Sequence, residues 1–285
     1  MGKFLRHQGN FPLDTGLGSG IPACVMTELH SDNRNTLMTL RRGLQVIELL
    51  SEAGPLGVSE LGRRLRLSKT VAHRLLATLE AQGYAAQDPA TSKYRLTFRI
   101  FMIGASIPQK LGLHDCAQPI LERLVAETGE TANVGVLDDI YMIYVQKVES
   151  PEPLRIGVPV GKRVPAFCTA LGKAILAFLP GERAGAIIAR TAFTPRTPNT
   201  IQSPGILERE LLRARAKGFA IDNEEFARGV RCVAAPVLLQ GKDPLAAISV
   251  SGPASRLSRA EAEEVGLLVK DAAAAISKEL EQSRR

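Results

Sequence analysis

The chain has 285 residues, of which 45% are hydrophobic, so its length favours about two domains that each bury an ordinary core. No apolar run is long enough to cross a membrane, and the first thirty residues lack the pattern of a secretory signal, so we expect a cytoplasmic protein without a membrane partner. The net charge is +7, which directs attention to where the excess of basic residues lies.

The positive charge is concentrated in one segment. Residues 39 to 112 contain eleven Lys and Arg but only five Asp and Glu, so six of the seven net charges lie there. This distribution predicts a basic module joined to a nearly neutral one. It suits a polyanionic partner for the first module, although a solvated basic face without any partner is the alternative.

The first 38 residues show no sustained hydrophobic periodicity and are predicted to be a disordered tail. They include the glycine-rich run GLGSG at residues 16–20. Because this run neither follows a predicted strand nor opens a predicted helix, we do not interpret it as a nucleotide-binding loop.

Three short helices are predicted next, between residues 39 and 82. In the first, Leu40, Leu44, Ile47 and Leu50 recur at helical spacing and are expected to face the core, and Gly54-Pro55 ends the run. The second covers VSELGRRLRL at residues 58–67. The third follows Ser68, a good N-cap residue, and extends to just before Gly83.

A basic hairpin is predicted after the third helix, where two short Tyr-containing segments flank the turn sequence DPAT. Three helices and a hairpin indicate a winged helix-turn-helix domain over residues 39–96, whose third helix would enter the major groove of double-stranded DNA. We predict base contacts from the third helix and phosphate contacts from its cap and the hairpin, although ordinary surface charge is the alternative for each residue. The predicted base-contacting residues are Lys69, Thr70, His73 and Arg74, and the predicted phosphate-contacting residues are Ser68, Lys93 and Arg95.

The remainder of the chain is predicted to be a linker helix over residues 97–112 and a larger domain over residues 113–285. In the larger domain, helical and extended segments alternate without a regular parallel βαβ rhythm, so the fold class is α+β. Helices are expected after residue 113, around residues 170–217, and from Arg259 to about Gln282. The predicted strands cover residues 131–137, 140–148, 154–160, 219–222, 232–239 and 246–251.

Several stretches of this sequence together resemble the IclR family of transcription regulators, from Leu40 to the C-terminus. They are SELGRRLRLSKTVAHRLLATLEAQGY, DPATSKYRL, GKRVPAFCTALGKAILA, GFAIDNEEFARGVRCVAAPV and PLAAISVSGPASR. The resemblance implies a GAF-like effector-binding domain and homodimers, or dimers of such dimers, that bind palindromic operators. It implies a regulator whose operator binding is modulated by a small organic acid.

The resemblance also implies a ligand site for a small carboxylate. Ser249 and Ser251 lie two apart on a predicted strand, so their hydroxyls face the same side, and the start of a helix would offer free amides to an anion. Purely structural roles are the alternatives for these residues, because serines on strands often hydrogen-bond to the backbone and an aspartate often braces a loop. An ionised Asp222 would also repel a carboxylate unless it were protonated or bound another part of the ligand. The residues matched to this site are Ile156, Val164, Ala170, Leu171, Asp222, Cys232, Ser249 and Ser251.

No catalytic or metal-binding pattern supports an enzyme. The four cysteines, Cys24, Cys116, Cys168 and Cys232, lie far apart and form no zinc-type pair, so neither a metal nor a cofactor is predicted. P-loop, GxSxG and HExxH motifs are missing, and no histidine follows residue 115. An enzyme that uses Cys168 as nucleophile is the weaker alternative, and a DNA-binding protein with a vestigial pocket is another.

Overall fold

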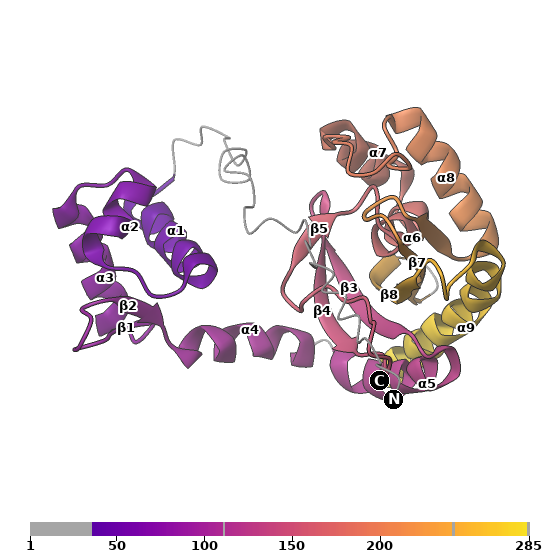
Figure 1. Cartoon of the computed structure of the whole chain (residues 1–285), viewed down its shortest axis with the longest axis horizontal. Helices are drawn as coiled ribbons and strands as arrows, with labels where there is room; N and C mark the ends of the chain where they lie inside the picture. Colours follow the sequence, from indigo (N-terminus) through magenta and orange to yellow (C-terminus); the bar gives the residue numbers. More distant parts are fainter. Residues whose placement is uncertain (1–35, 111, 241–242, 284–285) are drawn as a thin grey trace, which may run out of the picture. The chain divides into compact units, whose positions relative to one another are not determined.

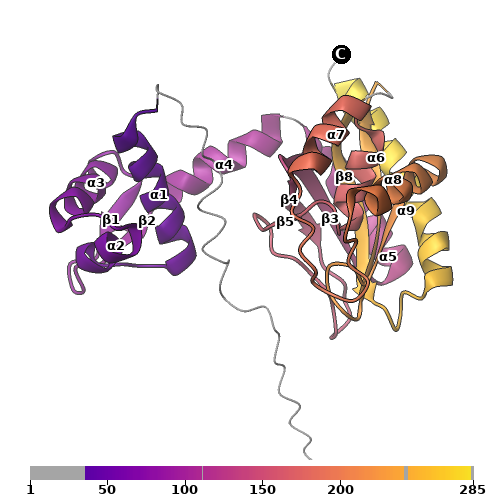
Figure 2. The ribbon, with the colours of Figure 1, turned by 90° about the horizontal axis from the view of Figure 1, so that it is seen from above.

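The computed structural model describes residues 36–110, 112–240 and 243–283, so the predicted tail up to residue 35 lies outside the described residues. Two compact units, each with its own core, divide after Ile100, inside helix α4 (Figures 1 and 2). None of the helices that the structure describes is both long and apolar enough to cross a membrane.

The first unit consists of three helices and a two-stranded antiparallel sheet, as the sequence predicts. The segment between the first two helices also joins the hairpin, because Leu56 and Tyr94 exchange backbone hydrogen bonds of 3.0 and 2.8 Å. The elements are α1 (Met38–Ala53), α2 (Val58–Leu65), α3 (Lys69–Ala81), β1 (Ala85–Gln87) and β2 (Tyr94–Leu96), followed by α4 (Phe98–Lys110).

The side of α1 that faces the core differs from the predicted one. Leu40 and Leu44 are 61% and 53% exposed, whereas Val46, Leu49 and Leu50 are buried. The prediction for Leu40 and Leu44 is therefore wrong. The helix has two apolar stripes, and its contacts with α3 and β2 decide which one is buried.

The second unit is built on one six-stranded antiparallel sheet with strand order β5-β4-β3-β8-β7-β6. This sheet and its helices confirm the predicted α+β class. The strands are β3 (Thr131–Asp138), β4 (Tyr141–Val148), β5 (Arg163–Pro165), β6 (Ala220–Asn223), β7 (Val230–Leu239) and β8 (Asp243–Pro253).

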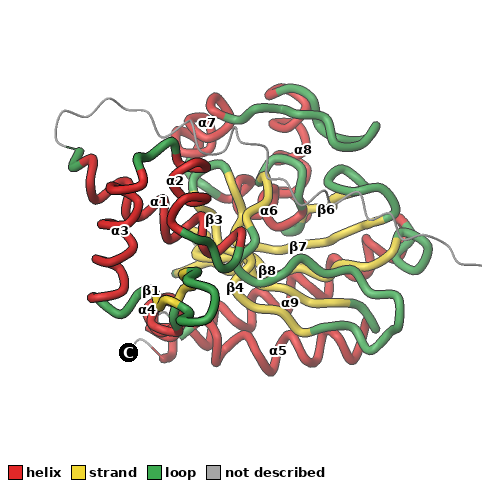
Figure 3. Tube along the Cα trace, turned by 60° about the vertical axis from the view of Figure 1, so that its left-hand side comes forward, coloured by secondary structure: helices red, strands yellow, loops and turns green. Residues whose placement is uncertain are grey.

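Helices cover both faces of this sheet, and β8 shows how the faces differ (Figures 1 and 3). Its Ile248 and Val250 belong to the core beneath α5 and α9, whereas Ala247 belongs to the core beneath the other helices. Because side chains alternate along a strand, Ser249 and Ser251 lie on the same face as Ala247. The helices are α5 (Leu113–Thr128) and α9 (Arg259–Ser283) on one face, and α6 (Ala170–Phe178), α7 (Gly181–Arg190) and α8 (Pro204–Lys217) on the other.

The predicted strand at residues 154–160 is not formed, and this segment is part of the loop that joins β4 to the short β5. The loop contains Pro153, Gly157 and Pro159. A proline cannot donate to a neighbouring strand and glycine weakens strand formation, so the apolar residues between them do not extend the sheet.

Candidate functional site

The first candidate surface is the exposed side of α3. One side of this helix packs into the core of the first unit through its buried residues Ala72, Leu75 and Leu76. The opposite side carries the four residues predicted to contact bases, and all four are exposed: Lys69, Thr70, His73 and Arg74.

A tight turn between α2 and α3 sets the direction of this helix. Arg66 ends α2 in the left-handed conformation, with φ 54°. Gly62 lies where the helices are close, because a Cβ there would be 3.0 Å from the Leu67 carbonyl oxygen and 3.6 Å from the Ala72 Cβ. Ser68 then caps α3 by accepting a 3.3 Å hydrogen bond from the Val71 amide. The turn and its cap therefore give α3 a fixed start.

The hairpin that follows presents two further cations. Asp88 shapes its tip, since Oδ1 accepts hydrogen bonds from the Ala90 amide at 2.8 Å and the Thr91 amide at 3.2 Å, which also lower the pKa of Asp88. Lys93 and Arg95 beyond the tip are exposed. No acidic group of the described chain forms a salt bridge with these two residues or with the cations of the α3 surface.

The second candidate site is a row of small polar residues on the sheet face beneath α6. Ser251 pairs with Thr131 of β3 on one side and with Cys232 of β7 on the other, and Cys232 pairs in turn with Asp222 of β6. Ser249 lies two residues along β8 from Ser251. The structure thus brings Asp222, Cys232 and both serines together across three strands.

The start of α6 lies on this face. Thr169 caps the helix by accepting a 3.3 Å hydrogen bond from Gly172, which leaves the amides of Ala170 and Leu171, the first two residues of the helix, without intrahelical partners. Only glycine fits at position 172, because a Cβ would lie 2.1 Å from the Ala166 carbonyl oxygen. Anions are favoured at such a helix start.

The two predicted apolar wall residues are placed differently. Val164 is buried in the core beneath α6, whereas Ile156 is half-buried in the loop between β4 and β5. Ile156 lines a pocket of about 140 Å³ with Thr131 and Lys147, and no other residue of the predicted site lines it. A second pocket, of about 260 Å³, lies between β6, α8 and α9 and has Lys173 and Glu225 in its wall.

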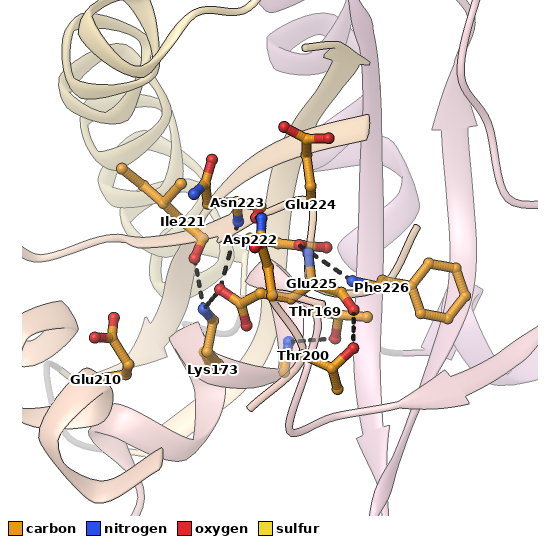
Figure 4. Close-up of polar contacts among 12 residues, drawn as sticks. Thr169, Lys173, Thr200, Glu210, Ile221, Asp222, Asn223, Glu224, Glu225 and Phe226 are labelled. Carbon is orange, nitrogen blue, oxygen red and sulfur yellow. Dashed lines mark hydrogen bonds and ion pairs between the residues drawn. The ribbon is translucent and has the colours of Figure 1, made fainter. Parts of the chain in front are cut away.

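Asp222 belongs to a buried charged cluster that the sequence analysis did not identify (Figure 4). The Nζ atom of Lys173 donates 2.5 Å hydrogen bonds to Glu225 Oε1 and to the Ile221 carbonyl oxygen. Asp222 Oδ1 accepts from the backbone amides of Glu225 at 2.7 Å and Phe226 at 3.4 Å. Asp222 therefore braces a loop, which is the alternative role that its sequence context left open.

Burial is the largest influence on the acids of this cluster. It raises the pKa of Asp222 to about 7, and repulsion from Glu225 adds to the increase while Lys173 opposes it. The pKa of Glu225 is also raised by burial, against the attraction of Lys173. Near neutral pH, Asp222 is consequently divided between its charged and uncharged forms.

The cysteines next to this cluster are poorly suited to nucleophilic chemistry. Cys168 is fully buried, and burial followed by the charge of Asp222 raises its pKa to about 12. The same two causes raise the pKa of Cys232. Because the thiolate is the reactive form, neither side chain is an activated nucleophile.

Two buried polar side chains of this region had sequence signals that went unused. Lys173 is the only charged residue in the apolar helix sequence ALGKAILAF. Asn133 lies between Thr131 and Gly135 on a strand whose alternate residues are apolar, and it contacts both serines. A charged residue within an apolar helix is the signal that could have identified Lys173, and an amide side chain within a mostly apolar strand is the signal that could have identified Asn133.

Comparisons with known proteins match both parts of the chain to one family. A family model described as IclR helix-turn-helix domain matches residues 39–89, and one described as bacterial transcriptional regulator IclR C-terminal matches residues 106–278. The transcriptional repressor IclR of Escherichia coli is 35% identical over 240 residues, covering 83% of this chain and 88% of that protein.

Two further relatives extend this similarity. The acetate operon repressor of Salmonella typhimurium is 33% identical, with the same 83% and 88% coverage. A crystal structure of a putative transcriptional regulator from Rhodococcus sp. RHA1 is 30% identical, has a TM-score of 0.76, and covers 87% of this chain and all of that one. These relatives are regulators rather than enzymes, and the chain belongs to the IclR family of transcriptional regulators.

Proposed function

We propose that this regulator binds a palindromic operator through α3 and that a small organic acid, held between α6 and the sheet, changes its operator affinity. The observation that carries the proposal is the position of the buried residues Ser249 and Ser251 on the sheet face beneath α6. Buried hydroxyls and free helix amides are suitable donors for a carboxylate.

The DNA-binding part of the proposal is supported by the exposure of the α3 surface. Lys69 and Arg74 are long cationic side chains in the N-terminal half of the helix, the part that approaches base edges in helix-turn-helix proteins. Lys93 and Arg95 on the hairpin are suited to neutralise phosphates. We assign sequence reading to α3 and sequence-independent phosphate binding to the hairpin.

A homodimer is supported by apolar side chains that are exposed on α1 and, separately, on α4. Large exposed apolar patches mark protein interfaces, and a two-fold axis would place two recognition helices about 34 Å apart, or a multiple of that. The exposed apolar residues are Leu37, Met38, Leu40 and Leu44 near the start of α1, and Phe98, Phe101 and Met102 in α4. We place this dimer in the cytoplasm.

The acid-binding part is supported by the name of one relative. One relative is named for the acetate operon, and acetate is a small carboxylate. A raised pKa also reduces the repulsion that an ionised Asp222 would impose on such a ligand. The competing proposal is a DNA-binding protein whose pocket no longer binds any ligand.

Thermal-shift measurements with a panel of small organic acids separate these two proposals. We expect at least one acid to raise the melting temperature of the wild-type protein, and the variant Ser249→Ala/Ser251→Ala to lose most of that increase because two donors are removed. The variant should retain its operator affinity. A panel without any stabilising acid would favour the vestigial pocket, and an unchanged response of the variant would refute the assigned site.

A further inference from the structure

The amide of Asn133 is the central polar group of the proposed ligand site, and it has one atom without a partner. Its Nδ2 donates to Ser249 Oγ and Ser251 Oγ, both at 3.3 Å. Its Oδ1 is buried and has no hydrogen-bond partner among the described residues. The Asn133 side chain is only 1% exposed, so bulk water does not solvate this oxygen.

Strand register places this amide next to the start of α6. Asn133 pairs with Ser249, and Gly135, two residues along the same strand, lies on the same face. A Cβ at Gly135 would be 3.0 Å from Leu171 Cδ1, so the first turn of α6 lies directly over this part of β3. The serines, the free helix amides and the unpaired oxygen therefore lie on one small area of the sheet.

The hydrogen-bonding capacity of this area is asymmetric. Both serine oxygens accept from Asn133, which leaves the O–H groups of Ser249 and Ser251 and the amides of Ala170 and Leu171 as donors. Asp222 Oδ1 is already occupied by two backbone amides. The acceptor that lacks a donor in this area is Asn133 Oδ1.

We propose that Asn133 selects 2-hydroxy acids, with Oδ1 accepting a hydrogen bond from the hydroxyl while the serine and helix donors bind the carboxylate. This inference rests on the proposed function and specifies its ligand class. A hydroxyl on the carbon next to the carboxylate donates to Asn133 Oδ1, whereas an acid without this hydroxyl leaves the buried oxygen unpaired. A new hydrogen bond to this buried acceptor stabilises the complex, so the hydroxyl should strengthen binding about tenfold.

Isothermal titration calorimetry of the full-length protein with three matched pairs tests this inference: glycolate and acetate, lactate and propionate, and mandelate and phenylacetate. The wild-type protein should bind the hydroxy member of any pair it accepts about tenfold more tightly. Pyruvate, which offers an acceptor in place of the hydroxyl, should bind less tightly than lactate.

Two variants separate selection by Asn133 from acid binding in general. Asn133→Leu should bind both members of a pair with about equal affinity, because the substitution removes the acceptor for the hydroxyl. Ser249→Ala, the matched control on the paired strand, should weaken both members of a pair by the same factor and keep the preference. Far-ultraviolet circular dichroism of each variant checks that the fold is intact.

The outcomes distinguish this inference from the proposed function. Acid binding without a hydroxyl preference in the wild-type protein, or a preference that survives in Asn133→Leu, overturns the role of Asn133 and leaves the acid site standing. Tighter binding of pyruvate than of lactate also overturns it, because the amide would then present its donor. If Asn133→Leu does not fold, the wild-type affinities for the acid pairs and for pyruvate still test the role of Asn133. No binding of any acid contradicts the proposed function itself.

Discussion

The two units of this regulator place their polar residues in opposite ways. In the first unit the residues assigned to binding are long, charged and exposed, such as Arg74 and Lys93. In the second they are mostly short and buried, such as Ser249 and Asn133. Exposed cations interact with a partner through water and salt, whereas a buried polar group must be paired within the fold. Substitutions should therefore have mild, graded effects in the first unit and large effects in the second.

The largest expected effect is the loss of the buried ion pair in the second unit. The Lys173 side chain is 1% exposed, so Lys173→Met leaves Glu225 as a buried acid without its cation. We expect the free energy of unfolding of this unit to fall by about 3–5 kcal/mol at pH 8. Urea denaturation gives the loss, and hydrogen exchange should locate it in β6 to β8 while α1 to α3 keep their protection.

An exposed ion pair in the same unit is the matched control. Lys217 pairs with Glu263 at the surface, so Lys217→Met should cost less than about 1 kcal/mol. Adding Glu225→Gln to Lys173→Met should recover much of the lost stability, because no unpaired charge then remains. Equal stability losses for the two pairs would contradict the expected difference between buried and exposed charged groups.

The next effect concerns base reading by α3. Arg74→Ala should weaken binding to the specific operator by about 1–3 kcal/mol and reduce the preference for operator over random DNA. Gel-shift titration measures both affinities. Arg183→Ala, an exposed arginine of α7, is the control and should leave them unchanged. An unaltered operator affinity of Arg74→Ala would mean that α3 does not read the operator as assigned.

A smaller effect should link ligand affinity to pH through Asp222. Burial and the charge of Glu225 raise the pKa of this carboxyl, whereas Lys173 and the backbone amides of Glu225 and Phe226 oppose the increase. The nearby side chains of Tyr144, Cys168 and Cys232 have raised pKa values themselves and stay uncharged in this range. With a pKa of about 7, Asp222 is mostly neutral at pH 6 and mostly ionised at pH 8. Because the ionised form repels a carboxylate, an acid that stays ionised throughout should bind about tenfold less tightly at pH 8 than at pH 6.

Asp222→Asn provides the comparison for this pH dependence. It retains a side-chain oxygen for the Glu225 amide and cannot ionise, so its calorimetric affinity should be nearly constant over the same range. Proton uptake on binding, measured in buffers of different ionisation enthalpy, should disappear in this variant. A pH dependence that persists in Asp222→Asn would assign it to another group.

The smallest effect is expected from the hairpin. Lys93→Ala should weaken binding to operator and random DNA alike, by only a few-fold at moderate salt, since it removes one phosphate contact. In a plot of log affinity against log salt concentration, the slope should decrease in magnitude by about 1. A change in sequence preference instead would show that Lys93 contacts bases.

The sequence predicted the first unit more completely than the second, because its signals are local. The Ser68 cap, the Gly83 stop and the Asp88 turn each act within a few residues. Local periodicity nevertheless chose the wrong stripe of α1, where Leu40 is exposed, since two apolar stripes compete.

The polar contacts of the second unit depend on residues far apart in the chain. Asn133 meets Ser249 across 116 residues, and Lys173 meets Glu225 across 52. These contacts require the strand order β3-β8-β7-β6 and the position of α6 over it, and spacing within the sequence fixes neither. The predicted ligand residues came from a family resemblance, whose quoted stretches include Lys173 and Glu225 but not Asn133, and none of these three was assigned a role.

Fluorescence anisotropy of a labelled promoter fragment from the regulated operon tests the central claim most directly, with scrambled DNA of equal length as competitor and organic acids present or absent. We predict at least a thousandfold preference for the promoter at moderate salt and a change in that affinity when a bound acid is added. Equal affinity for promoter and scrambled DNA under every condition would contradict the account.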